Sequence, residues 1–263
     1  MDGVPTEVLS RNVIGPLKKQ NFDHGTLSVS SNLSLPQPLE FEVDTTIEAS
    51  IAMATNAAKA LVSSHTLSFL RTSYGKRQIK AFGFSPDSWV QMIIQLAYHR
   101  LNGGRANING GTYEAATTRQ FQHGRTETIR VVSEESVRWC ESMDTPGMDR
   151  QEVRQLLRSA CNAHGASARD AGNGQGIDRL MFGMIKPPSI NTGLSSGHNA
   201  GLQKMLRPGE DAPELFTDNL FLRSKHWVLS TSTIYGPHFR VYGWGEVVPD
   251  GFGVAYVSGH DGW

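Results

Sequence analysis

The chain has few cysteines and no excess of charge of either sign. Its 263 residues contain two cysteines, Cys140 and Cys161, and 25 basic residues balance 25 acidic ones. Two thiols without metal-ligand spacing argue against a disulfide framework and against a metal site, and they fit a reducing compartment inside a cell. A balanced charge gives no reason to expect nucleic acid or an anionic membrane as a partner.

Long apolar runs and common nucleotide-binding loops are also missing. No segment of the sequence approaches the roughly 20 apolar residues that a transmembrane helix needs. The chain contains no Gly-x-Gly-x-x-Gly and no Walker-type loop, so a doubly wound nucleotide-binding fold is not indicated.

The order of the predicted elements indicates a mixed α/β protein. An alternating run at residues 39–43 predicts a strand, and Thr45 or Thr46 is expected to cap a helix with an apolar stripe from Ile47 to Leu61. Further helices are predicted over 86–101, 134–143, 150–171 and 177–185, and strands over 227–232, 239–242 and 253–257. This arrangement favours a layered domain with a mixed sheet and flanking helices.

Two lysines, four residues apart, precede a well-marked helix start. Ser85 is a good N-cap, Pro86 suits the first helical position, and Asp87 suits the positive end of the helix dipole. We expect Lys76 and Lys80 on a short loop and strand leading into this helix, where a cationic pair can hold phosphate groups. The alternative is a solvated basic surface loop.

Three further motifs follow in the sequence, and each of them is weak when taken singly. They are Thr112-Tyr113-Glu114 with Phe121–Arg130, then Gly176-Ile177-Asp178-Arg179, and then Ser230-Thr231-Ser232. Together with the lysine pair and the tail Gly245–Val254, they resemble the carnitine/choline acyltransferase family over essentially the whole chain.

The resemblance implies a fold like that of chloramphenicol acetyltransferase and reversible transfer of an acyl group between coenzyme A and the hydroxyl of carnitine. The family's general base is a histidine in the pattern His-x-x-x-Asp-Gly, and Met1-Asp2-Gly3 matches only the end of it. We therefore expect a C-terminal portion whose base lies outside this sequence. Residues 1–35 would be a remnant of the catalytic segment and residues 36–263 the C-terminal domain, with a missing N-terminal domain as packing partner.

The resemblance also assigns residues to roles. The coenzyme A contacts are expected to be Lys76, Lys80, Ser85 and Asp87. The carnitine contacts are expected to be Tyr113, Thr126, Thr128, Arg179, Ser230 and Ser232. Ser232 also matches the hydroxyl that stabilises the oxyanion, and the intervening Thr231 is expected to face outward. Choline lacks a carboxylate and would leave Arg179 unpaired, so carnitine is the predicted acceptor.

Acyl-chain length depends on one residue of register. Tyr242 matches the gate of the family's acyl pocket, where it would favour an acetyl or another short group. Alternatively, Tyr242 packs in the core and Gly243 opens a channel for a medium or long chain. A different class of function is also open, in which the chain is a catalytically inactive fragment that binds coenzyme A or another protein. The family implies no metal, and a mitochondrial or peroxisomal location.

Overall fold

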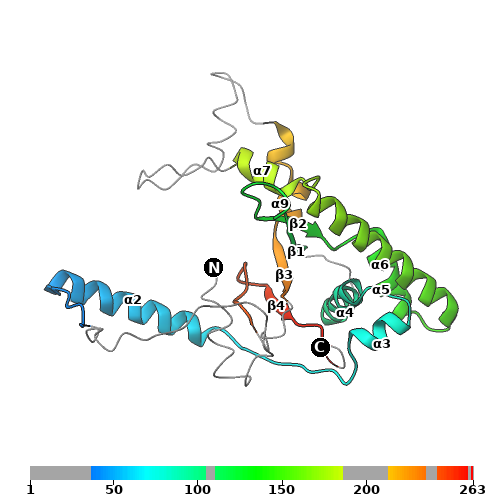
Figure 1. The fold of residues 1–263 in the computed structure, drawn as a ribbon, viewed down its shortest axis with the longest axis horizontal. Helices are drawn as coiled ribbons and strands as arrows, with labels where there is room; N and C mark the ends of the chain where they lie inside the picture. Colours follow the sequence, from blue (N-terminus) through cyan, green and yellow to red (C-terminus); the bar gives the residue numbers. More distant parts are fainter. Residues whose placement is uncertain (1–36, 105–109, 186–212, 235–241, 260–261, 263) are drawn as a thin grey trace, which may run out of the picture. The chain divides into compact units, whose positions relative to one another are not determined.

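The computed structural model describes residues 37–104, 110–185, 213–234, 242–259 and 262 (Figure 1). The chain divides into two compact units, Met1–Leu70 and Arg71–Trp263. All of the predicted site residues fall in the second unit. The expected domain boundary at residue 35 remains a prediction. No helix in the described ranges has the length and apolarity needed to cross a membrane.

The first unit contains helix α2, Thr45–Ser63. Its N-cap is Asp44, whose carboxylate accepts a hydrogen bond from the Ile47 amide at 2.8 Å, so the predicted caps Thr45 and Thr46 were wrong. Residues 39–43 form no strand, contrary to prediction, because no strand of the described sheet pairs with them. None of the side chains of α2 is buried.

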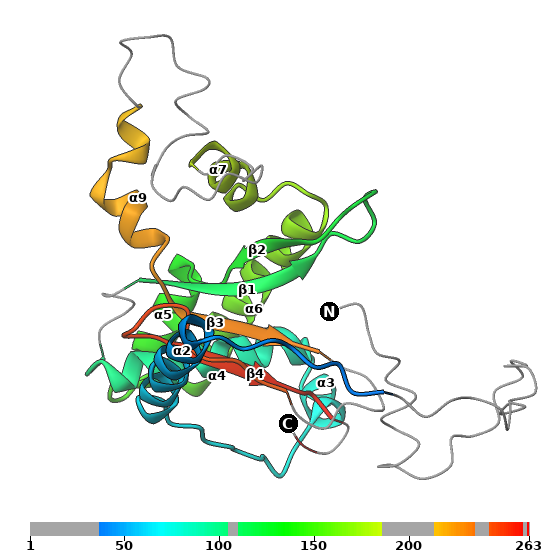
Figure 2. The same ribbon diagram turned by 90° about the vertical axis from the view of Figure 1, so that its left-hand side faces the viewer.

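The second unit contains a four-stranded sheet in the order β2-β1-β3-β4, with β1 at Gly111–Thr117, β2 at Thr126–Arg130, β3 at Trp227–Thr233 and β4 at Phe252–Tyr256. The β1–β2 pair is antiparallel, while the β1–β3 and β3–β4 pairs are parallel. Figure 2 shows the strands edge to edge, from β2 at the top to β4 at the bottom. The sheet confirms the predicted mixed α/β class. The strand predicted at 239–242 lies outside the described residues except for Tyr242.

Helices follow the predicted pattern closely. The elements are α3 (Lys76–Ala81), α4 (Pro86–Leu101), α5 (Glu134–Met143), α6 (Arg150–Gly172), α7 (Asp178–Ile185), the short 3₁₀ helix η1 (Glu214–Phe216) and α9 (Asn219–Ser224). The three helices predicted beyond residue 130 are confirmed. Lys76 and Lys80, however, lie on α3 and not on a loop and strand, because the segment after Gly75 closes a short helix over the buried Ile79.

Helix α4 begins and ends as predicted, but its buried face includes polar residues and leaves some apolar ones exposed. Ser85 caps it, and it ends at Leu101 before Gly103, whose φ of 68° suits glycine. Its apolar residues at helical spacing are Val90, Ile93, Ile94, Ala97 and Leu101, and of these Ala97 and Leu101 are exposed. Polar residues replace them on the buried face. The Gln91 amide donates to Thr231 Oγ1 at 2.8 Å, and the Gln95 amide donates to Thr112 Oγ1 at 3.0 Å.

The main core lies among α3, α4, α5 and α6. It contains Ile79, Phe84, Met92, Leu96, Val131, Trp139, Cys140, Ala160 and Cys161. Both cysteines are unpaired and buried. Burial is the main cause that raises the pKa of Cys140 to about 12 and that of Cys161 to about 11, so neither thiol is poised to react.

Candidate functional site

Three of the predicted carnitine contacts meet at the edge of the sheet. Arg179 at the start of α7 reaches β2, where its Nε donates to the Thr126 carbonyl at 2.8 Å and its Nη2 donates to Thr126 Oγ1 at 2.7 Å. The same Nη2 lies 3.3 Å from the Tyr113 hydroxyl on β1. Nη1 has no hydrogen-bond partner in the described part of the chain. The guanidinium group is therefore fixed on one side and keeps donors for a ligand.

The start of α7 is held in place by charged residues that the sequence analysis did not assign. Both carboxylate oxygens of the buried Glu127 accept from the Arg179 amide, each at 3.3 Å. Arg130 clamps Asp178 through two hydrogen bonds of 2.9 and 2.7 Å. A Cβ on Gly176 would clash with the Glu127 side chain, so this turn requires glycine. The signal available in the sequence was the presence of Glu127 and Arg130 within a short strand.

The two serines of the Ser-Thr-Ser motif lie on the same face of the sheet as Tyr113. Ser230 is the register partner of Tyr113, and neighbouring strands lie about 4.8 Å apart. Ser230 is buried and Ser232 is half-buried. Thr231 points to the opposite face, as predicted, but it is fully buried and donates to the Tyr113 carbonyl at 2.9 Å. The prediction that the Thr231 hydroxyl faces outward was wrong, because helix α4 covers that face of the sheet.

Thr128 also belongs to the predicted carnitine set. It is buried on β2 opposite Ala115 and shares a strand face with Thr126 by alternation. Its contact with carnitine remains a prediction.

The predicted coenzyme A residues are spread over α3 and the first turn of α4. Lys76 and Lys80 are one turn apart, which places them on one face of α3. Ser85 is exposed and accepts from the Ser88 amide at 3.4 Å. Asp87 is half-buried, and the Tyr256 hydroxyl donates to its carboxyl at 2.6 Å.

Asp87 also belongs to a group with metal-ligand spacing. Ligand atoms of Asp87, Glu114 and His164 all lie within 4.8 Å of one another. Burial, followed by the negative charge of Glu114, raises the pKa of Asp87 to about 6. The expectation that the protein binds no metal remains a prediction.

The two candidates for the acyl gate differ in their surroundings. The hydroxyl of Tyr242 is buried and has no hydrogen-bond partner within the ranges that the structure describes. Burial raises the pKa of this phenol, and the side chain of Ser232 and the backbone of Ile234, both close to the hydroxyl, lower it in part. The ring packs on Trp244 with centroids 5.8 Å apart. A Cβ on the exposed Gly243 would meet no atom within 4 Å.

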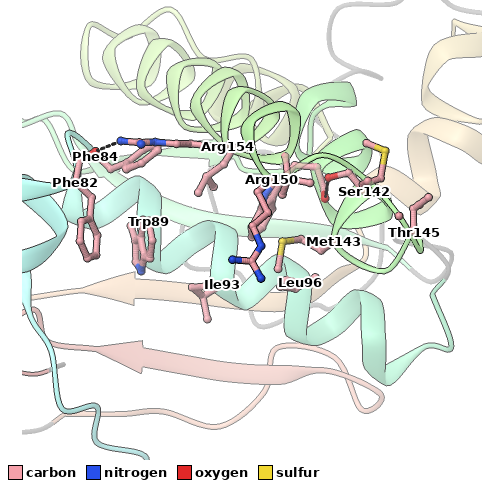
Figure 3. Close-up of a pocket in the computed structure, with 15 residues that line it drawn as sticks. Phe82, Phe84, Trp89, Ile93, Leu96, Ser142, Met143, Thr145, Arg150 and Arg154 are labelled. Atoms are coloured by element: carbon pink, nitrogen blue, oxygen red, sulfur yellow. Dashed lines mark hydrogen bonds between the residues drawn. The ribbon is translucent and has the colours of Figure 1, made fainter.

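A separate apolar cavity of about 630 Å³ lies among α4, α5 and α6. Figure 3 shows Trp89, Ile93 and Leu96 of α4 along one side, with the side chain of Arg150 from α6 reaching down toward Ile93. None of the predicted carnitine, coenzyme A or acyl-gate residues lines this cavity.

Comparison with known proteins decides the family. Residues 1–263 match the family model of choline/carnitine o-acyltransferases. The chain belongs to this family. The resemblance predicted from the lysine pair and the three motifs is therefore confirmed.

Curated relatives within this family have different substrates in their names. The mitochondrial carnitine O-acetyltransferase of Saccharomyces cerevisiae is 33% identical over 99% of this chain and 37% of its own length. The peroxisomal carnitine O-octanoyltransferase of Rattus norvegicus is 35% identical over 86% of this chain and 34% of its own length. The mitochondrial carnitine O-palmitoyltransferase 2 of Xenopus tropicalis is 33% identical over 86% of this chain and 32% of its own length. The chain thus spans about a third of the length of these relatives.

Proposed function

We propose that this chain provides the coenzyme A, carnitine and oxyanion parts of a carnitine acyltransferase site. The observation that carries the proposal is the anchored guanidinium of Arg179, held by Thr126 and Tyr113. Arginine is charged at every accessible pH and its planar fork matches a carboxylate. Carnitine has a carboxylate and choline does not, so this arrangement favours carnitine as the acyl acceptor.

The reaction proposed is reversible acyl transfer. The carnitine hydroxyl attacks the thioester carbonyl, a C–O bond forms, and the C–S bond breaks. The hydroxyl proton passes to a general base and then to the departing thiolate. Ser232 would donate a hydrogen bond to the oxyanion of the tetrahedral intermediate, and losing one such donor typically lowers turnover about 10²- to 10³-fold.

We also propose that the general base comes from outside this chain. Among the described histidines, His164 is buried on the opposite face of the sheet from Tyr113, where it pairs with Glu114. His226 lies 2.7 Å from Asp250, and the buried His99 lies 3.9 Å from Asp144. These contacts support a site that is completed by other residues, and alone the chain would be inactive in transfer.

For chain length, the packing of Tyr242 near Ser232 supports an acetyl or another short acyl group. The open space at Gly243 supports the alternative of a medium or long chain. Names of relatives do not separate the two, because they include acetyl, octanoyl and palmitoyl transferases. Two of these relatives are named mitochondrial and one peroxisomal, and we propose one of these organelles as the location.

The test is release of free thiol from acetyl-, octanoyl- and palmitoyl-CoA with carnitine or choline as the acceptor. It uses the chain alone and a longer version that contains a family-type His-x-x-x-Asp-Gly histidine. We expect turnover only for the longer version, with acetyl-CoA and carnitine preferred. In that version, Ser232→Ala should lower turnover, and the exposed Ser159→Ala should not. Turnover by the chain alone would contradict an external base, and binding of coenzyme A without turnover by either version would favour the non-catalytic alternative.

A further inference from the structure

A closed hydrogen-bond network lies behind the sheet face that carries Tyr113. The Tyr256 hydroxyl on β4 is 2.6 Å from Asp87 Oδ1 and 3.2 Å from Glu114 Oε1 on β1. The other oxygen of Glu114 is 2.6 Å from His164 Nε2 on α6. His164 Nδ1 is 2.9 Å from the Ser88 hydroxyl. The network therefore starts and ends on consecutive residues in the first turn of α4.

This closure fixes the first turn of α4 against three other elements. Glu114, His164 and Ser88 are almost fully buried, at 2%, 3% and 2% exposed, while Asp87 is half-buried. Asp87 is thus the member that reaches the surface. Gln91, one turn further along α4, donates to the Tyr256 oxygen at 3.1 Å and strengthens the same attachment.

The network contains two acidic groups, Asp87 and Glu114, and one basic group, His164. Two carboxyl groups face one histidine, and the side-chain contacts of Glu114 within the described ranges include no arginine or lysine. The titratable groups that face Asp87 are Glu114 from β1, His164 from α6 and Tyr256 from β4, and Tyr242 is within electrostatic reach. Tyr256 has only one hydrogen to share between two carboxyl groups. The second carboxyl group therefore becomes protonated or takes a donor from solvent or from a ligand, and Asp87 is the member that reaches the surface.

We propose that Glu114, His164 and Tyr256 are positioning residues that hold the Asp87 carboxyl for acyl-CoA and make acyl-CoA binding depend on pH. The inference rests on the proposed function, which assigns Asp87 to the coenzyme A site. In the ionised state Asp87 accepts a hydrogen bond from the cofactor, and in the protonated state it does so poorly. Affinity for coenzyme A is then lower on the acidic side of the Asp87 titration, near pH 6.

Opposite substitutions should shift this titration in opposite directions. Glu114→Gln removes a negative charge that raises the Asp87 pKa, so the midpoint should move to lower pH. His164→Gln removes an electrostatic interaction that lowers the Asp87 pKa, so the midpoint should move to higher pH. Tyr256→Phe deletes one oxygen atom and should weaken binding about 3- to 10-fold in the ionised state. A purely structural role would not produce shifts of opposite sign.

The experiment is calorimetric titration of the full chain with coenzyme A from about pH 5 to about pH 8. Tyr98→Phe is the matched control, because Tyr98 is a buried tyrosine of α4 outside the network. If Glu114→Gln or His164→Gln fails to fold, as judged by thermal unfolding, Tyr256→Phe still decides whether the network positions Asp87. An unchanged affinity in Tyr256→Phe, or midpoints that shift in the same direction, overturns the inference.

Two further outcomes are distinguishable. If the wild-type chain binds no coenzyme A at any pH, the assignment of Asp87 to that site fails, and the inference fails with it. If Zn²⁺ or Mn²⁺ raises the unfolding temperature and a chelator reverses the effect, a cation takes the place of the shared proton, and the proton-linked account is overturned although coenzyme A binding stands.

Discussion

Replacing Arg179 should separate the recognition of carnitine from that of choline. The side chain of Arg179 is exposed, and its guanidinium is held by one carbonyl and two hydroxyl groups. Arg179→Gln removes the positive charge, while Arg179→Lys keeps the charge but loses the fork that binds Thr126. Both variants should stay folded, because surface substitutions usually change the free energy of unfolding by no more than about 0.5 kcal/mol.

The size of the effect follows from the kind of bond that is lost. A hydrogen bond to a charged group contributes about 1.5–3 kcal/mol, which corresponds to a loss of carnitine affinity of about 10- to 150-fold in Arg179→Gln. Arg179→Lys should fall between this variant and wild type. Choline affinity should change little, because choline offers no carboxylate to Arg179. Affinity for coenzyme A should stay the same.

The assay is calorimetric or competition binding of carnitine and choline to the wild type and both variants. Arg138→Gln is the control, since Arg138 is an exposed arginine on α5 that pairs only with Glu134 in the described structure. Our assignment would be refuted if Arg179→Gln weakened carnitine and choline equally, or if it behaved like Arg138→Gln.

Three further predictions concern the cofactor residues, the gate and stability. Lys76→Ala and Lys80→Ala should each weaken coenzyme A binding about 2- to 5-fold, and added salt should reduce the difference from wild type; equal losses for a ligand without phosphates would argue against phosphate contacts. Tyr242→Phe removes a buried hydroxyl that lies close to the Ser232 side chain and the Ile234 backbone, so it should change the free energy of unfolding by no more than about 1 kcal/mol; a larger loss of stability would mean that the hydroxyl makes a full hydrogen bond. Asp87 has its pKa raised from 3.8 to about 6 by burial, so its contribution to stability is complete below 3.8 and is lost as the pH rises through about 6. The unfolding temperature of the wild type minus that of Asp87→Asn should therefore fall as the pH rises from 3.8 to about 6. A difference that does not change with pH would contradict the raised pKa.

Local signals in the sequence determined four helices of the second unit, α4, α5, α6 and α7, but not α3 or α9. Ser85, Pro86 and Gly103 mark the ends of α4 through backbone conformation and capping, which act over a few residues. The motif residues Tyr113, Thr126 and Arg179 were also identified from the sequence, through the family resemblance, before their contacts were known. Their roles in binding remain proposals.

Only the tertiary structure determined which face of each element is buried. Gln91 and Thr231 lie inside because each is the hydrogen-bond partner of the other, and no hydrophobic pattern contains that information. The strand predicted at 39–43 is absent for a related reason: a strand needs a paired neighbour, and no strand of the described sheet pairs with it.

The network of Asp87, Glu114, His164 and Tyr256 is the clearest case of this difference. Its members come from α4, β1, α6 and β4 and are up to 169 residues apart in the sequence. Asp87 and Glu114 stood in motifs of the sequence, but nothing along the chain connected either of them with His164 or Tyr256. The raised pKa of Asp87 and the joint role of the four residues depend on distances of 2.6 to 3.2 Å between elements, and such distances exist only after the sheet and the helices have packed together.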